Sequence, residues 1–119
     1  LDLAVGLSRA GGDAALYRQV LTSFHAEHHD DPSSLRRALA TGDQDAARRL
    51  VHRLKGVAGL MGAEPLHQRA AAALDASPGP DWPAAAEAVA GELEAVLKAM
   101  EMIALPATGG ERGGGVLSR

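Results

Sequence analysis

The chain contains no cysteine and very few aromatic residues. Its 119 residues include no Cys and only one Trp, one Tyr and one Phe. The absence of Cys excludes a disulfide framework and metal sites built from thiolates. With so few aromatics, the core must be built from Leu, Val, Met and many Ala. Ala-rich runs with few β-branched residues favour helices over strands.

The sequence also lacks a large excess of one charge and a long apolar run. The formal net charge is −3, from 12 Lys and Arg against 15 Asp and Glu. This balance argues against a nucleic-acid binder with a broad basic face. No apolar stretch approaches the roughly 18 residues that span a bilayer, so no membrane contact is expected. The chain begins at Leu1 rather than Met, without a signal peptide, which favours a domain of a longer polypeptide.

Apolar residues recur at helical spacing along most of the chain. Capping residues, Gly and Pro predict a helix within 1–10, one after the N-cap Asp13, and one after the N-cap Asp31 with Pro32 as its first residue. Further helices are predicted over 44–61, after Glu64-Pro65 to about Ala76, and from the cap Asp81 to about 103. The expected core-facing residues include Leu3, Leu7, Leu16, Tyr17, Val20, Leu21, Phe24, Leu35, Ala38, Leu39, Ala47, Leu50, Val51, Leu54, Val57, Ala58, Met61, Ala86, Val89, Leu93, Val96, Leu97, Met100 and Ile103. The pattern predicts one all-α domain over residues 1–105, an antiparallel four-helix bundle with additional short helices, and a disordered tail over 106–119.

One segment departs from this Ala-rich pattern, and it reads His52-Arg53-Leu54-Lys55-Gly56-Val57-Ala58-Gly59. A helix turns by about 100° per residue, so His52 faces solvent when Leu54 faces the core. Lys55, Gly56 and Gly59 lie within about 60° of His52 on the same helical wheel. One exposed strip therefore holds an imidazole, a lysine and two positions without side chains, accompanied by the cations Arg48, Arg49 and Arg53.

The residues of this strip suit nucleophilic chemistry at His52. Each glycine costs on the order of 1 kcal/mol relative to Ala inside a helix, so its presence needs a reason. Gly56 and Gly59 are interpreted as leaving space beside His52 for another molecule to approach. A solvated imidazole is largely neutral at pH 7 and nucleophilic. No Ser or Cys nucleophile with an orienting acid stands beside it, so His52 is interpreted as the nucleophile itself. Lys55 would then attract phosphoryl oxygens, and Arg48 would favour an acidic partner.

The residues His52-Arg53-Leu54-Lys55-Gly56, with Gly59 and Gly62-Ala63, resemble the signature of histidine-containing phosphotransfer (HPt) domains. The opening of the chain is similar to the first two helices of HPt modules in hybrid sensor kinases. The residues that carry this second likeness are Leu1-Asp2-Leu3, Gly6-Leu7, Gly12-Asp13, Leu16-Tyr17, Leu21 and Phe24. The resemblance covers about residues 1–103.

The resemblance implies a phosphocarrier of two-component signal transduction that is not itself an enzyme and has no ATP site. His52 would accept a phosphoryl group from a receiver-domain aspartyl phosphate and pass it to another receiver. Lys55 would stabilise the phosphoryl group, while Gly56 would permit docking together with Arg48 and Gly59. No cofactor is expected, because Mg²⁺ belongs to the partner receiver. The expected setting is cytoplasmic, with a hybrid sensor kinase in the same chain as a further candidate partner.

Three questions stay open at this level. The family often carries a polar residue in the next helix near the histidine, and here both Asp75 and Gln68 are candidates to orient His52. His25, His28 and His29 could place imidazoles on one helix face as metal ligands, or simply form a polar helix end. A helical module that only mediates protein association is a further alternative, with the last helix, 83–104, as a dimer surface.

Overall fold

The computed structural model describes residues 2–102, and within them the chain forms six helices. Their bounds are α1 Leu3–Arg9, α2 Ala14–His28, α3 Asp31–Thr41, α4 Gln44–Leu60, α5 Glu64–Ala76 and α6 Trp82–Met102. The predicted core position Ile103 and the predicted tail over 106–119 lie outside the described residues. No helix in the described part of the chain combines the length and the hydropathy of a membrane span.

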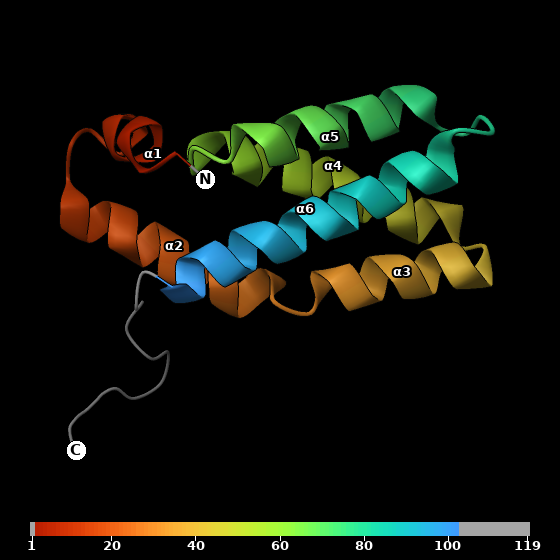
Figure 1. Ribbon diagram of the computed structural model, residues 1–119, viewed down its shortest axis with the longest axis horizontal. Coiled ribbons are helices and arrows are strands. Elements are labelled where there is room, and N and C mark those ends of the chain that lie inside the picture. The colour runs from red at the N-terminus through yellow and green to blue at the C-terminus, as the bar shows by residue number, and fades with distance from the viewer. Residues whose placement is uncertain (1, 103–119) are drawn as a thin grey trace, which may run out of the picture.

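The helices α3 to α6 form an antiparallel four-helix bundle. In Figure 1 successive members run in opposite directions, with α5 above, α3 below, α6 in front and α4 behind. Both α4 and α6 pack against α5 and α3, which closes the ring. The additional helices α1 and α2 lie at one end of the bundle. The all-α prediction of a four-helix bundle with extra helices is therefore confirmed.

Aspartates define the beginnings of several helices. The carboxylates of Asp2, Asp13 and Asp43 accept backbone N–H bonds from the first turns of α1, α2 and α4, with donor–acceptor distances of 3.2, 3.0 and 3.1 Å. The prediction of Asp31 as an N-cap is wrong by one residue, because α3 begins at Asp31 itself. The Asp31 carboxylate binds the His28 ring instead, at 2.6 Å.

The core is built as the composition suggested. Large apolar side chains on the bundle helices are fully buried, including Leu35, Leu54, Leu66, Leu93 and Trp82, the last only 1% exposed. Alanines with no exposed surface lie between them on α4, α5 and α6, so these helices approach closely: Ala47, Ala58, Ala70, Ala73, Ala86 and Ala90.

Two apolar residues expected in the core are instead exposed. Leu3 is 46% exposed and Leu16 is 45% exposed. The reason is the position of α1 and α2 at the end of the bundle, where α2 buries Tyr17, Leu21 and Phe24 but leaves its other side to solvent. Val20, Val57, Ala38, Leu39 and Leu7 are half-buried at the edge of the core.

The turn after α4 packs tightly against the start of the chain. The N–H of Asp2 donates to the Gly62 carbonyl at 2.7 Å, and the Tyr17 hydroxyl donates to the Met61 carbonyl at 2.8 Å. A Cβ atom at Gly6 would collide with the Tyr17 ring, and one at Gly62 would collide with the Asp2 carbonyl. Gly62 also has a φ of 77°, which favours glycine. Both glycines are therefore required by internal packing.

Candidate functional site

His52 stands outward from the middle of α4. Its side chain is exposed, whereas Val51 and Leu54 on either side of it in sequence are completely buried. The predicted outward direction of His52 is confirmed. Among residues 2–102, His52 is also the imidazole without a hydrogen bond, since the rings of His25, His28, His29 and His67 each have a partner. Both of its ring nitrogens are thus available to another molecule.

The two glycines of α4 have different surroundings. A Cβ atom at Gly56 would meet nothing within 4 Å, so neither packing nor backbone conformation within the described chain requires a glycine there. Gly59 is half-buried, and a Cβ atom there would lie 3.7 Å from Nδ1 of His67. The expectation that both glycines lie on the open strip is therefore correct for Gly56 and wrong for Gly59, because α5 covers that flank.

Cations surround His52 on the exposed face of α4. The exposed side chains of Arg48, Arg49 and Arg53 line a surface hollow of about 510 Å³ together with Asp45 and His52. Within the described residues, neither these arginines nor the half-buried Lys55 forms an ion pair. With three arginines against the single carboxylate Asp45, the hollow carries a net positive charge, which suits an acidic partner.

An apolar groove separates α2 from the C-terminal half of α4. Its volume is about 360 Å³, and two exposed leucines belong to its lining, Leu16 at 45% and Leu60 at 66% exposure. Phe24 and Met61 contribute buried apolar surface to the same lining. Sequence reasoning missed this groove because it placed Leu16 in the core. The available signal was Leu60, which the helical wheel places away from Leu54.

In the described structure the α5 side chain that forms a hydrogen bond with α4 is that of His67, which sequence reasoning did not single out. Its Nδ1 lies 2.9 Å from the carbonyl oxygen of Lys55. Because a carbonyl only accepts, Nδ1 carries the proton and donates. Asp75 and Gln68, the two candidates to orient His52, are both exposed on α5, and no hydrogen bond joins either to His52 in the described structure.

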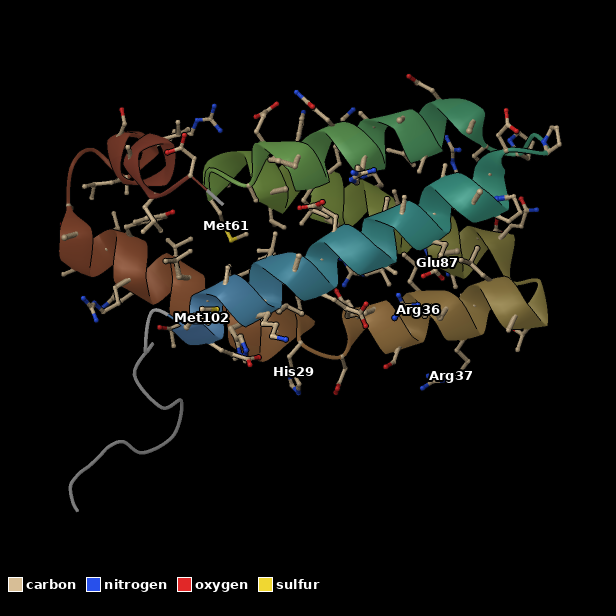
Figure 2. The ribbon with its side chains drawn as sticks, viewed as in Figure 1. His29, Arg36, Arg37, Met61, Glu87 and Met102 are labelled. Carbon is tan, nitrogen blue, oxygen red and sulfur yellow. The ribbon has the colours of Figure 1, made fainter. Side chains whose placement is uncertain are left out.

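The three histidines at the end of α2 do not converge on a common point. His25 binds Glu101 of α6 at 3.0 Å, and the buried His28 binds Asp31 of α3 at 2.6 Å. His29 points away from the bundle in Figure 2, and its Nδ1 contacts the Ala26 carbonyl of its own helix at 3.1 Å. Residues 2–102 contain no group of three side chains arranged to hold a metal ion. The geometry therefore gives no support to the metal-site alternative.

The structure also gives no support to the last helix as a dimer surface. The stripe of the last helix that could have served as an interface, from Val89 through Leu93 to Met100, is buried in the core of the chain itself.

Taken together, the fold and the site define a helical bundle that presents one unbonded imidazole, among cations, to another molecule. A comparison with protein-family models agrees, since the model described as Hpt domain matches residues 19–101. This match covers more than half of the chain, and the chain belongs to the Hpt domain family. Comparisons with curated proteins and with solved structures each found no match.

Family membership sets the general role of the chain. It is a phosphocarrier of the phosphorelays of two-component signalling, without a kinase site of its own. Domains of this family interact with receiver domains of response regulators. The matched residues include all of α3, α4 and α5, whereas α1 and the beginning of α2 precede the match.

Proposed function

We propose that His52 is the phosphoacceptor through which this chain receives a phosphoryl group from the aspartyl phosphate of a receiver domain and passes it to a second receiver. The observation that supports the proposal is the exposure of the His52 imidazole and its lack of hydrogen bonds. His52 is exposed on a helix inside the matched region, and its ring is free of the hydrogen bonds that hold the other histidines of the described chain.

The transfer needs only a neutral imidazole on this side of the reaction. A ring nitrogen of His52 donates its lone pair to phosphorus, and a P–N bond forms as the P–O bond to the receiver's aspartate breaks. The aspartate leaves as a carboxylate, while the second ring nitrogen of His52 keeps its proton. The return step, to another receiver, reverses these bond changes. The unpaired ring of His52 gives an incoming phosphoryl group access to its nitrogens.

The residues around His52 have separate supporting roles. Lys55, one helical turn further along α4, attracts the phosphoryl oxygens through its ammonium charge. Gly56 leaves space for the receiver to approach, because its position opens directly to solvent. Arg48, with Arg49 and Arg53, draws the acidic phosphate-binding pocket of the receiver toward the hollow on α4.

The apolar groove extends this docking surface toward α2. Leu60 follows Gly56 by one turn of α4, and Leu16 lies across the groove, so an apolar helix face of the receiver can be buried beside the charged contact. Gly59 contributes to docking only at its edge, because it is half-buried under His67.

The same proposal implies where Mg²⁺ is bound and in which cellular compartment the transfer takes place. Mg²⁺ is held by the receiver, and this chain supplies no ligand to it. A receiver as partner places the phosphotransfer in the cytoplasm, and a hybrid sensor kinase in the same polypeptide is one source of the phosphoryl group.

Phosphotransfer profiling tests this function. The chain is incubated with a panel of phosphorylated receiver domains and assayed for acid-labile, alkali-stable phosphate. We expect labelling by at least one receiver, loss of the label in His52→Gln, and retention of the label in the control His29→Gln. Chelation of Mg²⁺ with EDTA should stop transfer through its effect on the receiver. A His52→Gln variant that still accepts phosphate would refute the assignment, and a chain that no receiver labels would leave only a role in protein association.

A further inference from the structure

The C-terminal half of α4 and the turn after it accept hydrogen bonds from four other parts of the chain. The accepting groups are the backbone carbonyls of Lys55, Gly59, Met61 and Gly62, and their donors are, in the same order, the His67 ring, the Arg9 guanidinium, the Tyr17 hydroxyl and the Asp2 N–H. The donors belong to α5, to α1, to α2 and to the residue before α1. These bonds extend from the level of Lys55 to the turn after the helix.

This part of α4 has little means of holding its own shape. Gly56 and Gly59 carry no side chain, and glycine is the weakest helix former after proline. The carbonyls of the last turn of a helix also lack donors within the helix. The N–H of Ala63 goes to the Ala58 carbonyl, so the Gly59 carbonyl is free to take its donor from Arg9. Side chains from α5 and α1 thus bind the same stretch that the glycines weaken.

We propose that His67 and Arg9 form a brace, defined by their bonds to the carbonyls of Lys55 and Gly59, and that both are positioning residues for phosphotransfer through His52. The brace holds the backbone of Lys55 and Gly56 at a constant position relative to His52, although neither donor touches the reacting atoms. This role rests on the function proposed above.

The brace includes a residue outside the family match. Arg9 lies before the matched region 19–101. The first helix, which the family model does not cover, therefore contributes to the phosphotransfer face.

Transfer rates measured against receiver concentration test the role. His67→Leu and Arg9→Met remove the donors, whereas His67→Asn keeps an N–H near the Nδ1 position and Arg9→Lys keeps a cationic donor. His29→Leu and Arg37→Met serve as matched controls, because the exposed His29 contacts neighbours at the end of α2 and Arg37 points away from the bundle in Figure 2. His67→Gln moves the donor to the Nε2 position, which keeps a polar residue but misplaces the bond.

The expected signature separates positioning from docking. His67→Leu, His67→Gln and Arg9→Met should lower the saturating transfer rate about 10-fold while the half-saturating receiver concentration changes by less than about 2-fold. His67→Asn and Arg9→Lys should recover most of the rate. Equal rates in the donor-removing variants and the controls would overturn the proposal, as would a His67→Asn variant as slow as His67→Gln. The last comparison decides the case even if His67→Leu does not fold.

Amide hydrogen exchange gives a readout that does not depend on transfer. We expect faster exchange at residues 55–60 in His67→Gln and Arg9→Met than in the controls, and unchanged protection there would overturn the brace. If no receiver labels the wild-type chain, the proposed function fails and the positioning role fails with it, while the exchange data still show whether the brace exists.

Discussion

Two of the bundle faces that carry arginine differ in what the guanidinium contacts. On the face between α3 and α6, Arg36 lies beside Glu87 (Figure 2). Its guanidinium donates to the carboxylates of Glu87 and Glu94, with a shortest distance of 2.7 Å to each. These bonds raise the pKa of the Arg36 guanidinium and lower the pKa of the Glu94 carboxyl. On the exposed face of α4, Arg48, Arg49 and Arg53 have no acidic partner within ion-pair distance in the described residues.

Arginine therefore has two different roles in this small domain. Between α3 and α6 a guanidinium joins two helices, and its charge is neutralised within the chain. On α4 the guanidinium groups surround an exposed imidazole and an open glycine, and their charge is available to a second molecule. Internal pairing thus distinguishes the arginine that links two helices from the arginines beside His52, whose charge stays available.

Two exposed glycines, one on α4 and one on α6, give the largest expected difference between these faces. Gly56 on α4 and Gly91 on α6 are both helical, exposed and open, since an added Cβ would meet nothing within 4 Å at either. Leucine is a better helix former than glycine, so both Gly56→Leu and Gly91→Leu should fold. In a single-turnover assay we expect Gly56→Leu to slow transfer about 100-fold, because added bulk displaces the receiver. Gly91→Leu should keep the wild-type rate, and equal rates in the two variants would refute the docking role of Gly56.

Lysines give the next largest expected effect. Lys55→Ala removes the cation one turn from His52 and should slow transfer, or shorten the lifetime of the phosphorylated chain, by about 10-fold. Lys98→Ala removes an exposed lysine of α6 and should do neither. Both quantities are measured from the loss and gain of label over time. Normal behaviour of Lys55→Ala on both counts would remove Lys55 from the site.

The arginines separate binding from stability. Replacing Arg48, Arg49 and Arg53 with Gln should lower the association rate constant with the receiver about 10-fold at low salt. The difference should shrink at about 0.5 M salt, where screening is strong. Arg36→Gln should leave association unchanged and lower the thermal midpoint of unfolding, because it breaks the link between α3 and α6. Stopped-flow binding and thermal melts measure the two effects, and a reversal of this pattern would contradict the comparison.

A pH effect of smaller size belongs to the α3–α6 face. The Arg36 guanidinium holds the pKa of Glu94 below its ordinary value of 4.5, so this carboxylate stabilises the fold at neutral pH. That contribution is present above pH 4.5 and is lost as the pH falls through the lowered pKa of the folded state. Urea titrations at several pH values should show a smaller acid loss of stability in Glu94→Gln than in the wild type. The control Asp75→Asn, at an exposed position, should retain the wild-type acid response.

Much of the fold and the direction of His52 could be predicted because they depend on local rules. The caps at Asp13 and Asp43 locate helix starts through hydrogen bonds to residues three positions away. With Leu54 buried, the helical repeat leaves His52 no direction except toward solvent. These predictions need no knowledge of how one helix packs on another.

The missed features all depend on packing between elements. The bond from His67 to the Lys55 carbonyl requires the register of α5 on α4, which no periodicity specifies. The exposure of Leu16 follows from the place of α2 at the end of the bundle. Asp31 could cap a helix or bind His28, and the choice depends on the corner between α2 and α3. Sequence patterns locate the site on α4 but do not reveal the residues of other helices that hold it in place.

The only tryptophan of the chain, Trp82, opens α6 and is 1% exposed. Its indole emission therefore originates from a dry environment in the native state and should move to longer wavelength when the bundle opens. Every substitution considered above leaves this fluorophore in place. The chain thus contains an intrinsic optical signal by which loss of folding in any variant can be distinguished from loss of phosphotransfer, without attaching a dye.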